Sequence, residues 1–378
     1  MRIADFGVEM WLNENEENAR YHLSETCAKP FQVKELLQLA AKNENNYGKY
    51  MESIAEMTLD YGYITGSQRL KEAIAGMYRT LSPENITAAH GGIGANALLL
   101  MTLIEPGDHI IAFLPTYQQL YSMPESIGAQ VDLIQLKEED GWQIDPDAVK
   151  SLICSRTKAI CLNNPNNPTG TLIPEETMAR IVEIAREHDL YLICDEAYRG
   201  LSYEGDYLAP SVADLYEKGV ATGSMSKSFS LPGIRFGWVA GPAGLIADIN
   251  RHRDYHVISI GKLDDFFACV ALENREAIFE RNRSFCLKNL ELVKRWAASE
   301  PRFSFVEPSS STTCFVRFDL DLDSVALCRR LHEEKGTLLV PGRFFGYDDH
   351  FRLGFGNDTP VIENGLAAFS DWLRENGY

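Results

Sequence analysis

A single lysine, Lys227, stands among serines and small residues in the segment SMSKSFSLPG. Most lysines are solvated among other charges, whereas this one precedes a Pro-Gly turn and the apolar run of residues 234–241. A lysine amine can form an imine with an aldehyde, and in a partly desolvated pocket that imine is a reactive electrophile. The free amine, with an ordinary pKa near ~10.4, can also shuttle a proton. The segment therefore indicates covalent chemistry at one amine.

Two other segments and the flanks of Lys227 hold what an aldehyde cofactor with a ring nitrogen and a phosphate would need. Asp195 ends an apolar run, and a buried carboxylate there would keep a pyridine nitrogen protonated. The segment GGIGAN, residues 91–96, would offer backbone N–H groups at a helix start to a phosphate. Arg235 and Ser224 would add a cation and a hydroxyl. Together they predict a pocket for pyridoxal 5'-phosphate (PLP).

Each of these signals also has an ordinary structural explanation. A glycine-rich turn is often only a turn, and an aspartate after a strand is often a helix cap. The segment NNPNNPTG, residues 163–170, could be an Asn/Pro loop with Asx turns. The joint order and spacing of the four segments favour the cofactor pocket over these separate explanations.

The elements that must position these loops are short apolar runs that alternate with helical patterns. Strands are predicted over residues 109–115, 129–136, 158–165, 190–197 and 235–241. Helices are predicted over residues 174–189 and from Gly94 to the Pro106-Gly107 pair. Strands that alternate with helices predict an α/β fold with a mostly parallel central sheet flanked by helices. The ligands of such sheets gather at the carboxyl ends of the strands.

The pattern changes after about residue 263, where a long amphipathic helix is followed by short strands and two more helices. We therefore expect three parts. Residues 1–40 form an N-terminal segment that packs with the small domain, residues 41–263 form a large PLP-binding domain, and residues 264–378 form a small α+β domain.

Composition narrows the classes of partner. The formal net charge of −18 argues against nucleic acid and against an anionic membrane. No apolar run approaches the ~20 residues of a membrane helix, and the N-terminus does not resemble a secretory signal. The eight cysteines form no Cys-x-x-Cys pair and are expected to be buried free thiols in the cytoplasm. The histidines lack metal-ligand spacing, so no metal is expected.

The motifs NNPTG, DEAY, SxSKxFxxPGxRxGW and FRLGFG occur in an order that resembles the class I/II aminotransferases. The resemblance covers nearly the whole chain. It implies the fold-type I PLP-dependent transferase fold, PLP as cofactor, and a homodimer with shared active sites. The activity implied is transfer of an amino group between an α-amino acid and a 2-oxo acid. The implied substrates are therefore small molecules.

The resemblance also implies roles for individual residues. Lys227 matches the Schiff-base lysine, Asp195 the partner of the ring nitrogen, and Arg352 the arginine that binds the substrate α-carboxylate. Tyr198 and Asn167 match the residues that hydrogen-bond the phenolic oxygen of the cofactor, and Asn167 also helps to orient the carboxylate.

The remaining implied positions concern the ring and phosphate of the cofactor. Tyr117 matches the aromatic residue stacked on the ring, and Tyr61 matches the tyrosine that the neighbouring subunit contributes to the phosphate, with Tyr63 as a rival. The phosphate-binding positions within the same chain are Gly94, Ala95, Asn96, Ser224 and Arg235.

The N-terminal segment departs from the family pattern, because YHLSETCAKPF, residues 21–31, replaces the usual glycine-containing loop near the substrate. This segment faintly resembles enzymes of the capreomycidine synthase type, which act on arginine-derived amino acids. A PLP-dependent lyase or cyclase is therefore the alternative to an aminotransferase. A non-enzymatic effector-binding module of a transcription regulator is disfavoured, because no basic winged-helix domain precedes the motifs.

Two groups of charged residues are given structural interpretations. The acidic run of residues 13–18 is interpreted as a solvated face, with docking of a cationic substrate as the alternative. Arg199 and Arg343 are interpreted as surface or interface charges.

Overall fold

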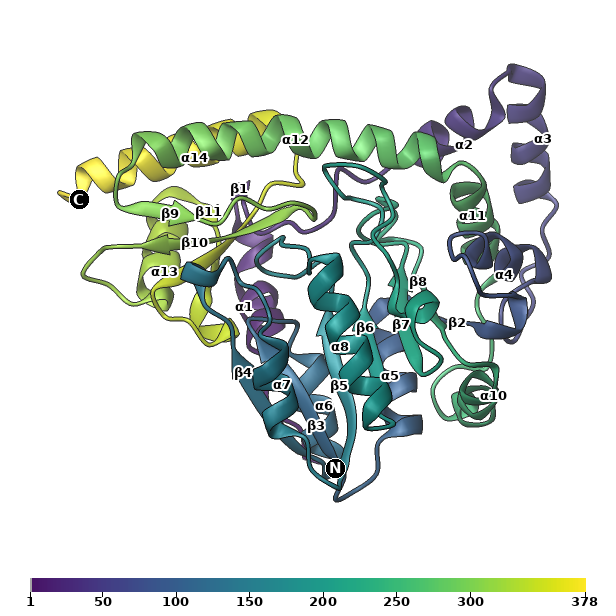
Figure 1. Cartoon of the computed structure of the whole chain (residues 1–378). Coiled ribbons are helices and arrows are strands. Elements are labelled where there is room, and N and C mark those ends of the chain that lie inside the picture. Colours follow the sequence, from purple (N-terminus) through teal and green to yellow (C-terminus); the bar gives the residue numbers. More distant parts are fainter. Residues whose placement is uncertain (1) are drawn as a thin grey trace.

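A seven-stranded sheet forms the centre of the larger part of the chain in the computed structural model, which describes residues 2–378 (Figure 1). The strands lie in the order β2 (Ile86–His90), β8 (Phe236–Ala240), β7 (Gly219–Ser224), β6 (Tyr191–Asp195), β5 (Thr157–Asn163), β3 (His109–Leu114) and β4 (Gln130–Gln135). All run in one direction except β8, which is antiparallel to both of its neighbours. The predicted α/β fold with a mostly parallel sheet is confirmed.

The burial of the strands explains why the sequence shows continuous apolar runs. Strands β7 and β8, inside the sheet, are buried at every residue. Strand β4, at the edge, has no buried residue. A strand that is covered on both faces needs apolar side chains at successive positions, so it loses the alternation of a half-exposed strand.

Helices cover both faces of this sheet (Figure 1). Helices α5 (Gly91–Leu103) and α6 (Gln119–Ile127) lie on one face, and α7 (Pro146–Leu152) and α8 (Glu175–Glu187) on the other. The remaining helices of this part are α4 (Gln68–Ala75), α9 (Val212–Leu215), α10 (Ala243–His252) and α11 (Lys262–Glu273).

Helix α8 lies within the predicted range, whereas the expected start of α5 at Gly94 is wrong. The helix begins at Gly91, directly after β2. Gly91 has φ +69°, a left-handed backbone conformation that glycine adopts readily, so the chain turns from strand into helix without a loop.

A four-stranded antiparallel sheet forms the smaller part, in the order β12 (Val340–Pro341), β13 (His350–Gly354), β10 (Thr313–Phe318) and β9 (Phe303–Phe305). Its helices are α12 (Arg275–Ser299), α13 (Ser324–Lys335) and α14 (Thr359–Glu375). Figure 1 shows α12 running across both parts of the molecule.

The N-terminal segment contacts both parts. It contains α1 (Gly7–Asn15), β1 (Tyr21–His22) and all but the last residue of α2 (Val33–Ala41), and α3 (Glu44–Ala55) follows it. Strand β1 pairs with β11 (Thr337–Leu338) of the smaller part, whereas the Gly7 N–H donates to Gln118 Oε1 of the larger part at 3.0 Å. The domain division at residues 40 and 263 stays a prediction. Within residues 2–378, no helix combines the length and the apolar character that crossing a bilayer requires.

Candidate functional site

The loops that hold the predicted site residues meet at one edge of the larger sheet. The carboxyl ends of the parallel strands β3, β5, β6 and β7 all lie at this edge, and the antiparallel strand β8 begins there. A cavity of about 410 Å³ opens at this edge. The predicted residues in its lining are Tyr117, Asn167, Asp195, Tyr198, Ser224, Lys227, Arg235 and Arg352.

Lys227 follows β7 and extends into the cavity toward the N-terminal segment. Its Nζ donates to Thr26 Oγ1 at 2.5 Å and to Cys27 Sγ at 3.5 Å. Burial alone would lower the pKa of the Lys227 amine, but the coulombic attraction of Cys27, Tyr198 and Glu25 reverses this effect, so the pKa lies above its ordinary value. Burial raises the pKa of the Cys27 thiol to about 11, so its attraction for the amine acts only at alkaline pH, where the thiolate forms.

Asp195 is the last residue of β6, and its carboxylate lines the same cavity. Asp195 Oδ2 accepts from Asn96 Nδ2 at 2.8 Å, and Oδ1 accepts from the Ala197 N–H at 3.0 Å. Thr222 Oγ1 in turn donates to Asn96 Oδ1 at 2.6 Å, which fixes the orientation of the amide. Burial raises the pKa of Asp195, and a cationic group placed beside this carboxyl would lower the pKa again by favouring the charged form.

Arg352 reaches the cavity from β13 of the smaller sheet and is 3% exposed. One guanidinium nitrogen donates to Asn167 Oδ1 and the other to the Ser24 carbonyl, both at 3.2 Å. The Nε of Arg352 has no hydrogen-bond partner among residues 2–378, and neither has the phenol oxygen of Tyr198. Buried polar atoms normally have hydrogen-bond partners, so these two atoms are candidates to hydrogen-bond a ligand in the cavity.

The start of α5 lies against Ser224 and Arg235. A Cβ added at Gly92 would lie 3.2 Å from Ser224 Cβ, and one added at Gly91 would lie 3.0 Å from Arg235 Nη2. The amino end of α5, a hydroxyl and a guanidinium therefore lie close together, and this combination suits a phosphate.

The predicted triplet Gly94, Ala95 and Asn96 lies further along α5. Gly92 and Ile93 line the cavity, whereas Gly94 and Ala95 are absent from its lining. Asn96 faces Asp195. The structure thus places Gly91 and Gly92 beside Arg235 and Ser224. They were not singled out from the sequence, because the helix was expected to begin at Gly94.

Tyr61 and Tyr63 stand apart from the other predicted residues. They are 78% and 57% exposed and do not line the cavity of their own chain.

Sequence reasoning placed residues 21–31 near the substrate but missed the cavity residues of helix α1. Helix α1 and the residue after it present Val8, Glu9, Leu12 and Glu16 to the cavity, and the segment after β1 presents Ser24, Glu25 and Thr26. The spacing 9, 12 and 16 places three side chains on one face of a helix. This helical spacing could have indicated that the three side chains share a face. The local sequence does not indicate against which other element that face packs.

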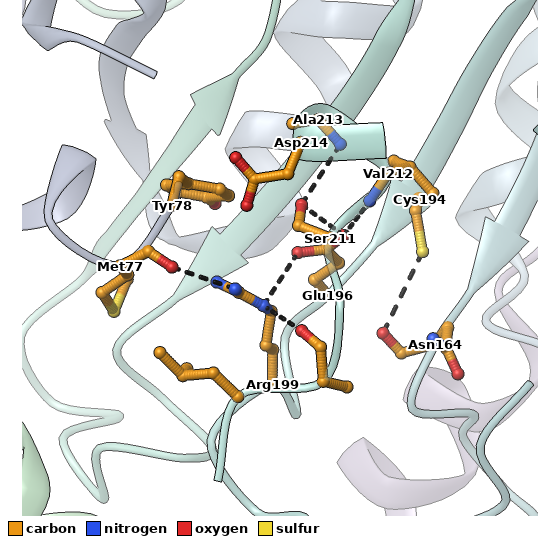
Figure 2. A network of polar contacts seen from close by, with 12 residues as sticks. Met77, Tyr78, Asn164, Cys194, Glu196, Arg199, Ser211, Val212, Ala213 and Asp214 are labelled. Carbon is orange, nitrogen blue, oxygen red and sulfur yellow. Dashed lines mark hydrogen bonds and ion pairs between the residues drawn. The ribbon is translucent and has the colours of Figure 1, made fainter. Parts of the chain in front are cut away.

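A buried polar network surrounds Glu196, the residue that follows Asp195 in the sequence (Figure 2). Glu196 Oε1 accepts from Ser211 Oγ at 2.8 Å and from the Val212 N–H at 3.2 Å, and Arg199 Nε lies 3.7 Å from Glu196 Oε2. Arg199 also stacks over the Tyr78 ring at 4.9 Å. The interpretation of Arg199 as a surface charge is wrong, because its side chain is only 9% exposed. Arg343 is half exposed and pairs with Asp348.

The residues present fit PLP. The cavity contains an amine that can react with its aldehyde, a buried carboxylate for its ring nitrogen, and a helix N-terminus with a hydroxyl and a guanidinium for its phosphate. Tyr117 adds an aromatic side chain to the same lining.

Comparison with known proteins agrees with this chemistry. Residues 28–369 match the family described as aminotransferase class I and II. Capreomycidine synthase of Streptomyces vinaceus is 31% identical over 82% of this chain and 79% of its own length. Arginine–pyruvate transaminase of Pseudomonas aeruginosa is 29% identical over 80% of each chain. A solved PLP-dependent aminotransferase of Streptococcus suis is 39% identical, covers 99% of both chains and superposes with a TM-score of 0.95.

Proposed function

This chain belongs to the aminotransferase class I and II family, and from that premise we propose that it transfers an amino group between an α-amino acid and a 2-oxo acid. The cofactor of the family and of its solved relatives is PLP. When bound, PLP supplies an aldehyde for the amino group and an electron-accepting ring for the bond broken at the substrate Cα.

The residues of the cavity have separable tasks in this proposal. Arg352, oriented by Asn167, would bind the substrate α-carboxylate, since a guanidinium can donate two parallel hydrogen bonds to it. Lys227, as a free amine, would carry the proton that leaves the substrate Cα. Asp195 would hold the proton at the ring nitrogen, Tyr198 and Asn167 would donate to the phenolic oxygen, and Tyr117 would stack on the ring. The observation that carries the proposal is the presence of Lys227, Asp195 and Arg352 in one cavity.

The phosphate would be held at the amino end of α5 by Ser224 and Arg235, with Gly94, Ala95 and Asn96 in the helix behind it. Helix N-termini attract anions through free N–H groups and the helix dipole.

We also propose that the enzyme is a homodimer with shared active sites. Large apolar side chains are exposed in two segments that lie side by side, residues 59–64 and 255–263. The Ile260 N–H donates to the Tyr63 carbonyl, and Lys262 pairs with Asp60. Exposed apolar surface of this kind favours an interface. Tyr61, in this surface, would reach the phosphate of the partner's site.

A PLP-dependent lyase or cyclase acting on an arginine-derived amino acid is the second candidate. The similarity to capreomycidine synthase and the N-terminal residues in the cavity lining favour it. With an amino acid alone, an aminotransferase accumulates pyridoxamine phosphate. A lyase or cyclase returns the cofactor to its aldehyde form.

We place the enzyme in the cytoplasm. All eight cysteines are free thiols, which suits a reducing compartment, and seven of them are buried as expected. The exception is Cys154, which is exposed.

The test is replacement of Lys227 by Ala. We expect loss of the visible absorbance of the cofactor attached to this amine and a fall in kcat of at least ~10³-fold, since both the covalent link and the proton carrier are removed. Circular dichroism should show an intact fold. Unchanged absorbance and turnover in the folded variant would eliminate the proposed mechanism.

A further inference from the structure

Three carboxylates of the N-terminal segment line the cavity that holds Lys227. Glu9 lies on α1, Glu16 directly follows α1, and Glu25 follows β1. Glu25 Oε1 accepts from the Thr26 and Cys27 N–H groups at 2.8 and 2.7 Å. Glu9 Oε1 accepts a longer hydrogen bond, at 3.3 Å, from the Tyr117 hydroxyl. Among the ion pairs within residues 2–378, none involves these three carboxylates.

The cations in the cavity lining already have other tasks. The proposed function assigns Lys227 to the cofactor, Arg235 to the phosphate and Arg352 to the substrate carboxylate. Carboxylates in a partly buried site are stabilised by a cation nearby. The N-terminal wall of the cavity therefore carries negative charge that forms no ion pair with a cation of the lining among residues 2–378.

Arg352 provides a second observation, because it would bind the anionic end of a ligand whose other end faces the carboxylates. Arg352 is 3% exposed, forms no ion pair within residues 2–378, and has an Nε without a partner. Burial lowers its pKa, while Glu9 and Glu25 act in the opposite direction, so these carboxylates are near enough to influence the guanidinium. The cavity thus offers a cation to an anionic ligand group and, nearby, carboxylates to a cationic one.

The surface between the charged groups is apolar in part. The same face of α1 presents Val8 and Leu12 beside Glu9. An apolar stem with a charged tip, as in lysine and arginine side chains, matches such a wall because its methylene groups pack while its head reaches a carboxylate. A short side chain with its own carboxylate would instead meet charges of equal sign.

We propose that Glu9 selects amino acids whose side chain ends in a positively charged group, an inference that rests on the proposed function. Glu16 and Glu25 add negative potential to the same wall. Glu9 is a specificity-determining residue in this arrangement, because it would contact the substrate side chain and leave the reacting atoms to Lys227.

The experiment compares L-arginine with L-citrulline, which has the same length but no charge. Sodium borohydride first reduces the cofactor onto Lys227 in the holoenzyme, so that binding is measured by calorimetry without turnover. We expect L-arginine to bind at least ~10-fold more tightly than L-citrulline, because one partly buried charge pair is sufficient for that ratio. L-aspartate should bind more weakly than either.

Two variants of the same segment complete the test. Glu9→Gln keeps the shape and the acceptor for Tyr117 but removes the charge, and should reduce the arginine-to-citrulline ratio to within ~3-fold. Glu14→Gln, at an exposed position of α1 outside the cavity, should keep the wild-type ratio.

The outcomes separate this inference from the proposed function. Equal or tighter binding of L-citrulline or L-aspartate by the wild-type protein would overturn the inference alone, whether or not Glu9→Gln folds. An unchanged ratio in folded Glu9→Gln would do the same. If borohydride attached no cofactor to Lys227, the proposed function would fail and this inference with it.

Discussion

At the scale of the residue, Asp195 and Glu196 show how burial and neighbours give adjacent carboxylates different tasks. Asp195 faces the cavity, whereas Glu196 faces the network of Arg199 and Ser211 (Figure 2). Burial raises the pKa of both carboxyl groups, that of Glu196 to about 7. Glu196 Oε2 has no hydrogen-bond partner among residues 2–378, so its charge is only partly compensated.

This pKa makes stability depend on pH through Glu196. Because the folded-state pKa is raised, the contribution of Glu196 to stability is fully present below its unfolded pKa of 4.5 and is lost as pH rises through about 7. We expect the fall in unfolding free energy between pH 5 and pH 8 to be smaller in Glu196→Gln than in the wild type, by about 2 kcal/mol. Urea unfolding at both pH values measures it.

The exposed position Glu363 provides the control, since Glu363→Gln should keep the wild-type dependence on pH. An identical pH dependence in Glu196→Gln and the wild type would show that Glu196 does not titrate in this range.

At the scale of the element, the start of α5 couples backbone conformation to anion binding. Gly91 combines a φ of +69° with a Cβ position only 3.0 Å from Arg235 Nη2. A side chain there would disturb both the turn from β2 into the helix and the place of the guanidinium. The nearest atom to that Cβ belongs to the guanidinium that the proposed function assigns to the phosphate.

We expect Gly91→Ala to weaken PLP binding by at least ~10-fold, because loss of one charge-assisted contact has about that effect. Gly107→Ala is the matched control, since Gly107 has φ +93° with no atom within 4 Å of an added Cβ. It should share the backbone strain yet change PLP affinity less than ~2-fold. Absorbance titration of the apoprotein with PLP measures both, and equal effects would refute a specific role of the α5 start.

At the scale of the whole molecule, the exposed apolar surface bears on assembly. Leu59 is 77% exposed, Ile64 59% and Tyr255 90%, which are high values for large apolar side chains. The same surface carries Tyr61, which matches the family tyrosine that binds the phosphate in the active site of the neighbouring subunit. Assembly would therefore cover apolar area and complete the phosphate site in one step.

Light scattering should give a mass of twice 42.5 kDa for the wild-type protein. Ile64→Asp should shift the mass to that of one chain and weaken PLP binding, because a carboxylate placed in an apolar interface is desolvated without a partner. Leu133→Asp, at an exposed apolar position on β4, should remain dimeric. A single-chain mass for the wild-type protein would refute the shared-site dimer.

The sequence by itself determined which local elements form and which loops carry chemistry. Buried strands need continuous apolar residues and helices need apolar residues at helical spacing, so these patterns are local. Parallel strands end at one edge, and this rule was enough to bring Asp195, Asn167 and Lys227 together in the prediction. The cofactor followed from the same residues, and the family motifs added Arg352.

Tertiary structure alone decided which distant elements complete the cavity. Glu9 and Thr26 approach Tyr117 and Lys227 across separations of 108 and 201 positions, and no local pattern encodes contacts of that kind. The burial of Arg199 likewise depends on Met77 and Tyr78, which come from another segment. Local periodicity reports which face of an element is apolar, but the partner of that face is chosen by packing of the whole chain, and so the contribution of α1 to the cavity wall became visible only in the fold.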